Sequence, residues 1–196
     1  MAKAIAVPGR SKVEIDRSAA LFLSEFQPAA IKKPGPVDVE SLFEIVMQEK
    51  YGIETGYTDL SHLGPGVLGY TDAASKTSYV DKSLSDADDL PAKRLFRSTV
   101  AHEIKHCIKH VQILNLFRSI CKDKDDDGLY RREKSDIKPY EDPEWQAWVF
   151  AGALLMPQRH ILDLHRRGSS IEEMAGIFDV NPAFVRSRLK RLGALK

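Results

Sequence analysis

The sequence lacks the features of a secreted or membrane-bound protein. Of its 196 residues only two are cysteines, Cys107 and Cys121, and so few favour reduced thiols over a disulfide framework. No apolar run approaches the ~20 residues that a helix needs to cross a bilayer. Residues 1–17 also lack the apolar region of a signal peptide. These absences predict a cytoplasmic protein that makes no membrane contact.

An excess of charge of either sign is also absent. Lys and Arg together number 29 and Asp and Glu number 28, so the net charge is +1. A balanced charge provides no overall field that would attract nucleic acid or a membrane surface. The length suffices for one domain with a substantial core, alone or with a small appendage.

The most informative stretch that is present is the motif HExxH at residues 102–106. No Gly or Pro occurs in residues 95–117, and apolar residues recur there at three- and four-residue steps, which predicts an amphipathic helix. The apolar positions are Phe96, Val100, Ile104, Cys107, Ile108, Val111 and Leu114. His102 and His106 then share one face and can bind one Zn²⁺. Glu103, rotated by about 100° from His102, stands beside the metal, where a general base is needed.

Competing interpretations of this helix remain open. The motif could occur by chance on an amphipathic helix that carries two surface histidines. His110 lies one further turn along, too far to share the metal, and we expect it to be exposed or to lie behind the ligands. Cys107 points onto the apolar stripe, and we interpret it as a small buried hydrophobe.

A catalytic zinc site needs a third protein ligand, and Glu144 is the best candidate. Residues 143–157 are almost entirely apolar, which predicts a buried helix that Asp142 caps, with Pro143 at its first position. Ala147 and Ala151 follow Glu144 on the same face, and their small side chains allow close approach to the HExxH helix. The alternative is that Glu144 only complements the helix dipole.

These two blocks together give the sequence a family resemblance. HExxH followed by ExxAxxFAxxLLMP, here from Glu144 to Pro157, resembles the ImmA/IrrE family of bacterial and phage metallopeptidases. The resemblance implies that His102, His106 and Glu144 hold zinc and that Glu103 is catalytic. The chain departs from the usual family pattern at two positions. Lys105 stands where the family usually has Gly, and Trp148 stands where it often has Asn.

Shorter patterns predict the remaining elements. We expect residues 1–12 to be unstructured, residues 13–26 and 38–50 to be helical, and residues 28–36 to form a Pro-rich linker. Three strands are expected before the HExxH helix, at residues 52–58, 66–71 and 77–81. Their edge could hold an extended peptide above the metal, or the last two could be an ordinary hairpin.

The segment between the two metal blocks imitates a calcium loop. Its DxDxDG spacing starts at Asp123, but the twelfth position of that loop is Lys134 in place of a bidentate glutamate. We therefore reject an EF-hand, and we expect a solvated loop of mixed charge.

The C-terminal region carries three short helical patterns, at residues 158–166, 171–178 and 182–192. The last two are spaced like a helix-turn-helix. Four basic residues on the last helix would contact DNA under that hypothesis: Arg186, Arg188, Lys190 and Arg191. We favour a tail that packs on the core through its apolar residues, because a short basic surface alone is not specific.

The sequence thus predicts an α+β fold, mainly helical and zincin-like, with a small sheet before the HExxH helix. The expected divisions are an N-terminal helix and linker (1–35), a zinc metallopeptidase domain (36–166) and a C-terminal helical tail (167–196). A further donor to the reacting carbonyl is expected from among Tyr79, Tyr140 and His160.

The expected function is Zn²⁺-dependent cleavage of a protein substrate. By the family resemblance, that substrate is a helix-turn-helix repressor of a mobile element or a stress response. The alternative is a zinc-fold regulatory protein that docks a partner or DNA without proteolysis. DNA is the less favoured partner, and no membrane partner is expected.

Overall fold

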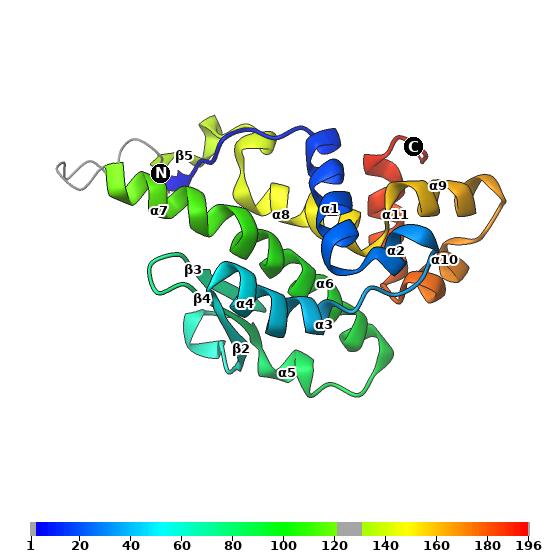
Figure 1. Ribbon diagram of the computed structural model, residues 1–196, viewed down its shortest axis with the longest axis horizontal. Helices are drawn as coiled ribbons and strands as arrows, with labels where there is room; N and C mark the ends of the chain where they lie inside the picture. Colours follow the sequence, from blue (N-terminus) through cyan, green and yellow to red (C-terminus); the bar gives the residue numbers. More distant parts are fainter. Residues whose placement is uncertain (1–2, 121–130, 196) are drawn as a thin grey trace.

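The computed structural model describes residues 3–120 and 131–195 of the chain. Figure 1 shows a small sheet on one side of a long helix, and α1, α8 and the C-terminal helices on the other. The α-helices and strands are, in chain order, β1 (Lys3–Ile5), α1 (Lys12–Phe26), α2 (Pro28–Lys32), α3 (Val39–Ser41), α4 (Met47–Tyr51), β2 (Glu54–Thr58), β3 (Gly69–Asp72), β4 (Thr77–Asp81), α5 (Lys82–Ser85), α6 (Leu90–Lys105), α7 (Val111–Ile120), β5 (Arg131–Glu133), α8 (Pro143–Leu155), α9 (Gln158–Arg166), α10 (Ile171–Phe178) and α11 (Pro182–Arg191). The predicted α+β, mainly helical class is confirmed.

The sheet that precedes the long helix has the strand order β2-β4-β3. β2 runs parallel to β4, with Glu54 opposite Thr77, and β3 runs antiparallel to β4. The β3–β4 turn is closed by the Asp72 side chain, which accepts backbone hydrogen bonds from Ala74 and Ser75. Within the described residues β3 is an edge strand, so one of its sides is available for pairing.

The HExxH motif lies on one continuous helical rod formed by α6, a π-helical segment (His106–His110) and α7. Asp89 caps the start of α6 by accepting a hydrogen bond from the Ala92 backbone N–H. The predicted helix is confirmed, but it begins at Leu90, and its π-helical segment was not anticipated. Single π turns of this kind occur often at functional sites.

The helix α8 packs against both α6 and α1. Asp142 caps it by accepting a hydrogen bond from the Glu144 backbone N–H at 2.9 Å, as predicted. Ala147 and Ala151 are fully buried, so their small side chains permit close packing of α8 on its neighbours. This packing brings the first turn of α8, with Glu144, alongside the HExxH helix.

The C-terminal helices are part of the same hydrophobic core. Met174, Phe178, Val180, Val185 and Leu189 are fully buried within it, which confirms the predicted packing. Three of the four basic side chains on α11 are engaged within the chain: Arg186 with Glu172, Arg188 with Asp16, and Arg191 with the backbone oxygen of Trp148. These contacts leave few of its cations free for a phosphate backbone.

Two expectations for the N-terminal part are wrong. Residues 3–5 form the strand β1, which pairs antiparallel with β5, with Ala4 opposite Arg132. The Pro-rich residues 28–36 include the helix α2, which starts at Pro28. Proline is well suited to the first position of a helix, and a strand pairing over so long a separation leaves no local signal in the sequence.

Two other features fall partly or wholly outside the described residues. Cys121 and most of the calcium-like segment belong to residues 121–130.

Among the described helices, none combines the length and apolar character that crossing a membrane requires.

Candidate metal centre

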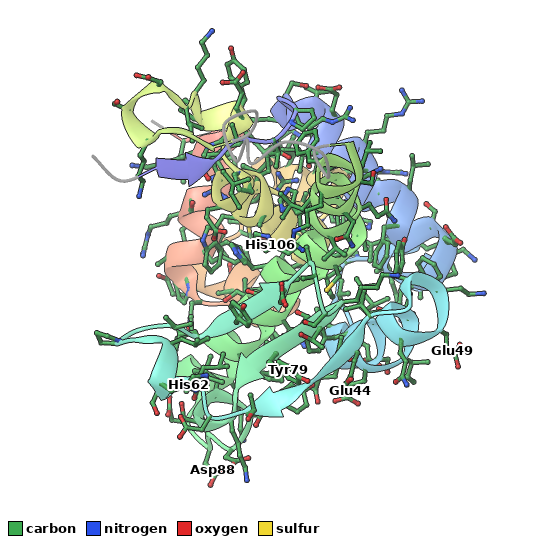
Figure 2. All side chains as sticks on the ribbon, turned by 90° about the vertical axis from the view of Figure 1, so that its left-hand side faces the viewer. Glu44, Glu49, His62, Tyr79, Asp88 and His106 are labelled. Atoms are coloured by element: carbon green, nitrogen blue, oxygen red, sulfur yellow. The ribbon has the colours of Figure 1, made fainter. Side chains whose placement is uncertain are left out.

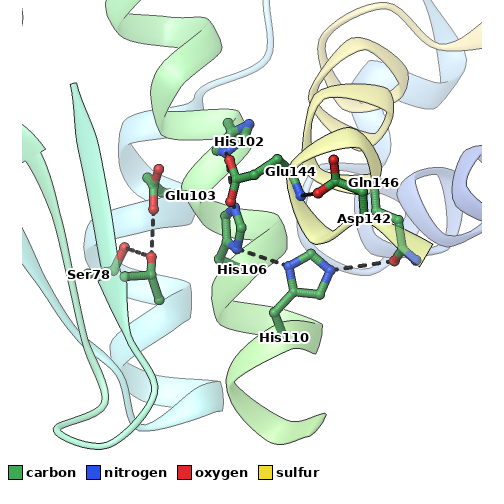
Figure 3. A network of polar contacts seen from close by, with 9 residues as sticks. Ser78, His102, Glu103, His106, His110, Asp142, Glu144 and Gln146 are labelled. Carbon is green, nitrogen blue, oxygen red and sulfur yellow. Dashed lines mark hydrogen bonds and ion pairs between the residues drawn. The ribbon is translucent and has the colours of Figure 1, made fainter. Parts of the chain in front are cut away.

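Three side chains bring their ligand atoms together beside the long helix. The two Nε2 atoms of His102 and His106 lie 2.9 Å apart. The Glu144 carboxylate oxygens lie 3.1 Å from the first of these nitrogens and 3.4 Å from the second. All three residues offer ligand atoms within 4.8 Å of one another, and Figure 3 shows them converging from two helices. Two imidazole nitrogens and one carboxylate oxygen form a donor set that suits Zn²⁺.

The surroundings hold these groups in place and leave one side open. The His102 ring packs against the Trp148 ring, with centroids 4.5 Å apart. The side chain of His102 is 7% exposed, whereas that of Glu144 is 63% exposed. The carboxylate therefore marks the solvent side of the cluster, from which a further molecule could approach a bound ion.

The protonation states of this cluster suit metal binding. Burial lowers the pKa of His106 well below its ordinary value, so its imidazole is neutral at physiological pH. The hydrogen bond with His102 lowers the pKa of Glu144, so that side chain is an ionised carboxylate. Neutral imidazole and ionised carboxylate are the forms that bind metals.

Glu103 lies beside the cluster and against the sheet. Its side chain is buried, and its Oε2 accepts a hydrogen bond of 2.6 Å from the Thr71 hydroxyl on β3. The same hydroxyl lies 2.7 Å from the Ser78 hydroxyl on β4. Burial raises the pKa of Glu103 to about 7. A carboxylate that titrates near neutral pH is matched to the work of a general base.

Close approach of the sheet to Glu103 requires a glycine at position 69. A Cβ atom on Gly69 would lie only 2.4 Å from the Glu103 Oε1, which is closer than atoms can pack. Strand β3 therefore contacts the carboxylate with its bare backbone at Gly69 and with the hydroxyl of Thr71 two residues later.

Hydrogen bonds behind the cluster fix the orientation of the second histidine. The Gln146 Nε2 donates to the backbone oxygens of Pro8 at 3.0 Å and Tyr140 at 2.8 Å, so its Oε1 faces His110. The His110 Nε2 lies 3.5 Å from that oxygen and is therefore its N–H donor. The remaining ring nitrogen of His110, Nδ1, accepts from the His106 Nδ1–H at 2.9 Å.

This chain of hydrogen bonds leaves the His106 Nε2 without a proton, with its lone pair directed at the cluster. Burial lowers the pKa of His110 to about 3, which keeps that ring neutral and able to accept. Such support behind a ligand is typical of metal sites. His110 is only 2% exposed and contacts His106, so of the two expectations the exposed position is wrong and the place behind the cluster agrees with the structure.

The two departures from the family pattern occupy distinct places. Trp148 covers one face of His102, as described above. Lys105 points elsewhere: it is 3% exposed, and its ammonium group lies 5.1 Å from the centre of the Phe150 ring. Burial, and next the charges of Lys109 and Arg10, lower the pKa of Lys105 to about 8.

A cleft of about 500 Å³ opens over the cluster. Its walls come from β3, the long helix, α8 and Ile5 of β1, and they include His102, Glu103, His106 and Glu144. Tyr70 of β3 also lines the cleft and is 43% exposed. The cleft thus combines the polar cluster with apolar walls, next to an edge strand.

The three residues predicted as further donors do not line this cleft. The Tyr79 hydroxyl donates to Glu54 at 3.1 Å, and Figure 2 shows Tyr79 on the sheet, apart from His106. His160 contacts the backbone oxygen of Ile31. Tyr140 is 43% exposed at the surface. That expectation is wrong for all three, and Tyr70 is the tyrosine that the fold brings to the cleft.

An HExxH helix that faces a glutamate from a second helix, within an α+β fold, defines a zincin-like protein. The chain belongs to the Peptidase_M78 family, described as the IrrE N-terminal-like domain, whose model matches residues 88–190. The matched segment includes His102, Glu103, His106 and Glu144. The resemblance to ImmA/IrrE proteins is thereby confirmed.

Among solved structures, the chain is similar to one from Mycobacterium tuberculosis that is described as a transcriptional regulator. The TM-score is 0.56 at 16% sequence identity, and the match covers 90% of this chain. It covers 46% of the other chain, so this chain spans about half the length of that neighbour. At this identity the likeness shows the fold alone. No match was found among curated proteins.

Proposed function

We propose that this protein is a zinc-dependent endopeptidase. The observation that carries the proposal is the convergence of His102, His106 and Glu144, with the carboxylate of Glu103 beside them on the wall of one cleft. Membership of a peptidase family supports it. His102, His106 and Glu144 would hold the zinc ion, and Glu103 would act on the reacting water.

The chemistry assigns one task to each group. Zn²⁺ held by the three ligands would supply a Lewis acid that polarises the peptide carbonyl and makes water more acidic. Glu103 accepts a proton from the water molecule as the water oxygen bonds to the carbonyl carbon. Glu103 then passes that proton to the amide nitrogen as the C–N bond breaks. Thr71 orients the carboxylate through its hydrogen bond.

The position of the cleft supports a polypeptide as substrate. The edge strand β3 borders it, so an extended peptide can pair with that edge by main-chain hydrogen bonds. Val67, Leu68 and Trp148 provide apolar wall for its side chains. By the family resemblance, the substrate would be a helix-turn-helix repressor that is cut at one site.

The proposal is tested with variants of the purified chain. Glu103→Gln leaves all three proposed ligands in place, so we expect near-normal zinc content and a fall in cleavage of at least ~10²-fold. His102→Ala and Glu144→Ala should lose zinc and cleavage together, because an incomplete site holds zinc poorly. Glu141→Ala, three residues before Glu144, is the matched control and should keep both.

The assays are metal analysis of each variant and mass spectrometry of its reaction with a candidate helix-turn-helix repressor. That candidate is taken from the genes next to the one for this chain where they encode such a repressor. Full cleavage by Glu103→Gln would remove Glu103 from the mechanism. Full zinc content in Glu144→Ala would remove that ligand.

A regulatory role without proteolysis is the second candidate. The neighbour of similar fold is described as a transcriptional regulator, and we consider the same role for this chain. Such a protein would dock a partner protein or DNA and would keep its biological effect in Glu103→Gln. Binding to DNA would weaken steeply with salt. The arginines of α11 already contact other groups of this chain, which disfavours DNA as the partner.

A further inference from the structure

A second cavity lies between α1 and the long helix, away from the cleft of the metal centre. Its volume is about 310 Å³. One wall comes from α1 and the residues just before it, and the other from Lys105, Lys109 and Ile113, spaced one turn apart on the rod. Gln146 of α8 also lines it. None of the four residues of the proposed zinc site lines this cavity.

The unusual feature of this cavity is a buried cation. Lys105 is 3% exposed, and among the described residues no carboxylate or other hydrogen-bond acceptor contacts its ammonium group. Its one specific contact is the face of the Phe150 ring. A largely buried charge without a counterion is costly. The ammonium group is not one of the fully enclosed polar atoms that lack a partner, so it keeps slight access to the cavity, where its N–H donors can meet a ligand.

The charges around the cavity add to this imbalance. Arg10, Arg17 and Lys109 also line it, whereas Glu14 is its one acidic wall residue. The Glu14 carboxylate is engaged by Arg10 at 3.2 Å and by Ser11 at 2.8 Å. No described acidic group is thus left to neutralise Lys105.

The rest of the wall is mainly apolar, with Pro8, Ile15, Leu21 and Ile113 as its apolar side chains. An ammonium group without a counterion, among further cations, matches a negatively charged group, and the apolar walls match a hydrocarbon body. We propose that this cavity binds a small amphipathic carboxylate, whose charged group contacts Lys105 and whose apolar body lies along Ile113. A ligand there would also adjoin Gln146, the amide that orients His110.

The test measures binding of octanoate to the full chain by isothermal titration calorimetry. The comparison probes are 1-octanol, which has the same apolar body without the charge, and inorganic phosphate, which is anionic but has no apolar body. Octanoate should bind at least about tenfold more tightly than 1-octanol, because charge-assisted hydrogen bonds are the strong ones. It should also bind at least about tenfold more tightly than phosphate, which has no apolar body to contact the walls.

Two variants locate the site. Lys105→Met keeps the length of the side chain and should weaken octanoate binding about tenfold or more, with octanol binding unchanged. Ile113→Ala should weaken octanoate and octanol alike, since both lose apolar contact. Lys190→Met, on the exposed side of α11, is the control and should bind octanoate as the wild type does.

Equal binding of octanoate by Lys105→Met and the wild type would overturn the proposal. So would tighter binding of phosphate than of octanoate, or an absence of octanoate binding to the wild type. Octanol binding by Lys105→Met shows that the cavity is intact. If that variant fails to fold, Ile113→Ala still decides, because unchanged octanoate binding there excludes this cavity.

Discussion

The Thr71 hydroxyl on the sheet donates a hydrogen bond of 2.6 Å to the Glu103 carboxylate on the long helix. The two residues are 32 positions apart, so the sheet and the helix meet at the group proposed as the general base. The bond favours the ionised form of Glu103 and opposes the rise in pKa that burial causes. The position of β3 thus sets the chemistry of a residue on another element.

Replacing this hydroxyl should shift the pH dependence of cleavage. Thr71→Val keeps the shape of the side chain but removes the donor, so the pKa of Glu103 should rise further above its ordinary value. A general base acts when deprotonated, so the rising limb of the rate should move to higher pH. We expect cleavage at pH 6 to fall about tenfold, with zinc content unchanged. Thr71→Ser should restore the wild-type profile of rate against pH.

Gly69→Ala should displace the same carboxylate by direct collision. A Cβ at this position meets the Glu103 Oε1 at 2.4 Å, so either the side chain or strand β3 must move. Misplacing a catalytic group by about 1 Å can cost ~10²-fold in rate, and we expect a loss of that order with zinc content retained. Gly56→Ala on β2 is the matched control, because its Cβ makes only an ordinary contact of 3.6 Å with Tyr79. Cleavage that is equal in the two variants would contradict the expectation.

His110→Phe should weaken zinc binding without removing a ligand. The variant keeps an aromatic ring in the buried site but loses the acceptor that fixes His106. Loss of such support typically costs 10–100-fold in metal affinity, and we expect a fall in that range. The measurement is competition with a chromophoric zinc chelator. His62→Phe, at an exposed position, should leave the affinity unchanged.

Arg188→Ala should destabilise the whole chain. The Arg188 side chain is 1% exposed and pairs with Asp16 of α1, which is 12% exposed, so the substitution leaves a carboxylate largely buried and unpaired. Breaking a buried pair costs ~3–5 kcal/mol, measured as the free energy of unfolding in urea. Arg186→Ala removes an exposed pair with Glu172 and should cost less than ~1 kcal/mol. Similar losses in both variants would refute the structural role of Arg188.

The parts of the candidate site that follow from the sequence are those that local geometry determines. The shared helix face of His102 and His106 follows from residue spacing, and the cap at Asp142 follows from residue type. Glu144 could be singled out because it is the only charge inside an otherwise apolar helix. Periodicity likewise predicted the helical rod and the strands before it.

The parts that escaped prediction depend on contacts between distant segments. Nothing near Thr71 in the sequence indicates that it meets Glu103, and nothing near Gln146 indicates that it faces His110. The strand β1 forms only because residues 131–133 come alongside it. The one signal in the sequence for the contact with Glu103 was the pair Gly69 and Thr71, two residues apart in the edge strand β3.

The pairing of β1 with β5 has a practical consequence for work with this protein. Ile5 of β1 forms part of the wall of the cleft, so an affinity tag joined ahead of residue 3 would begin close to its mouth. A flexible tag there could enter the cleft and compete with a substrate. Figure 1 shows the C-terminal end beside α9 and α11, well separated from the N-terminal end. Purification tags for activity measurements therefore belong at the C-terminal end.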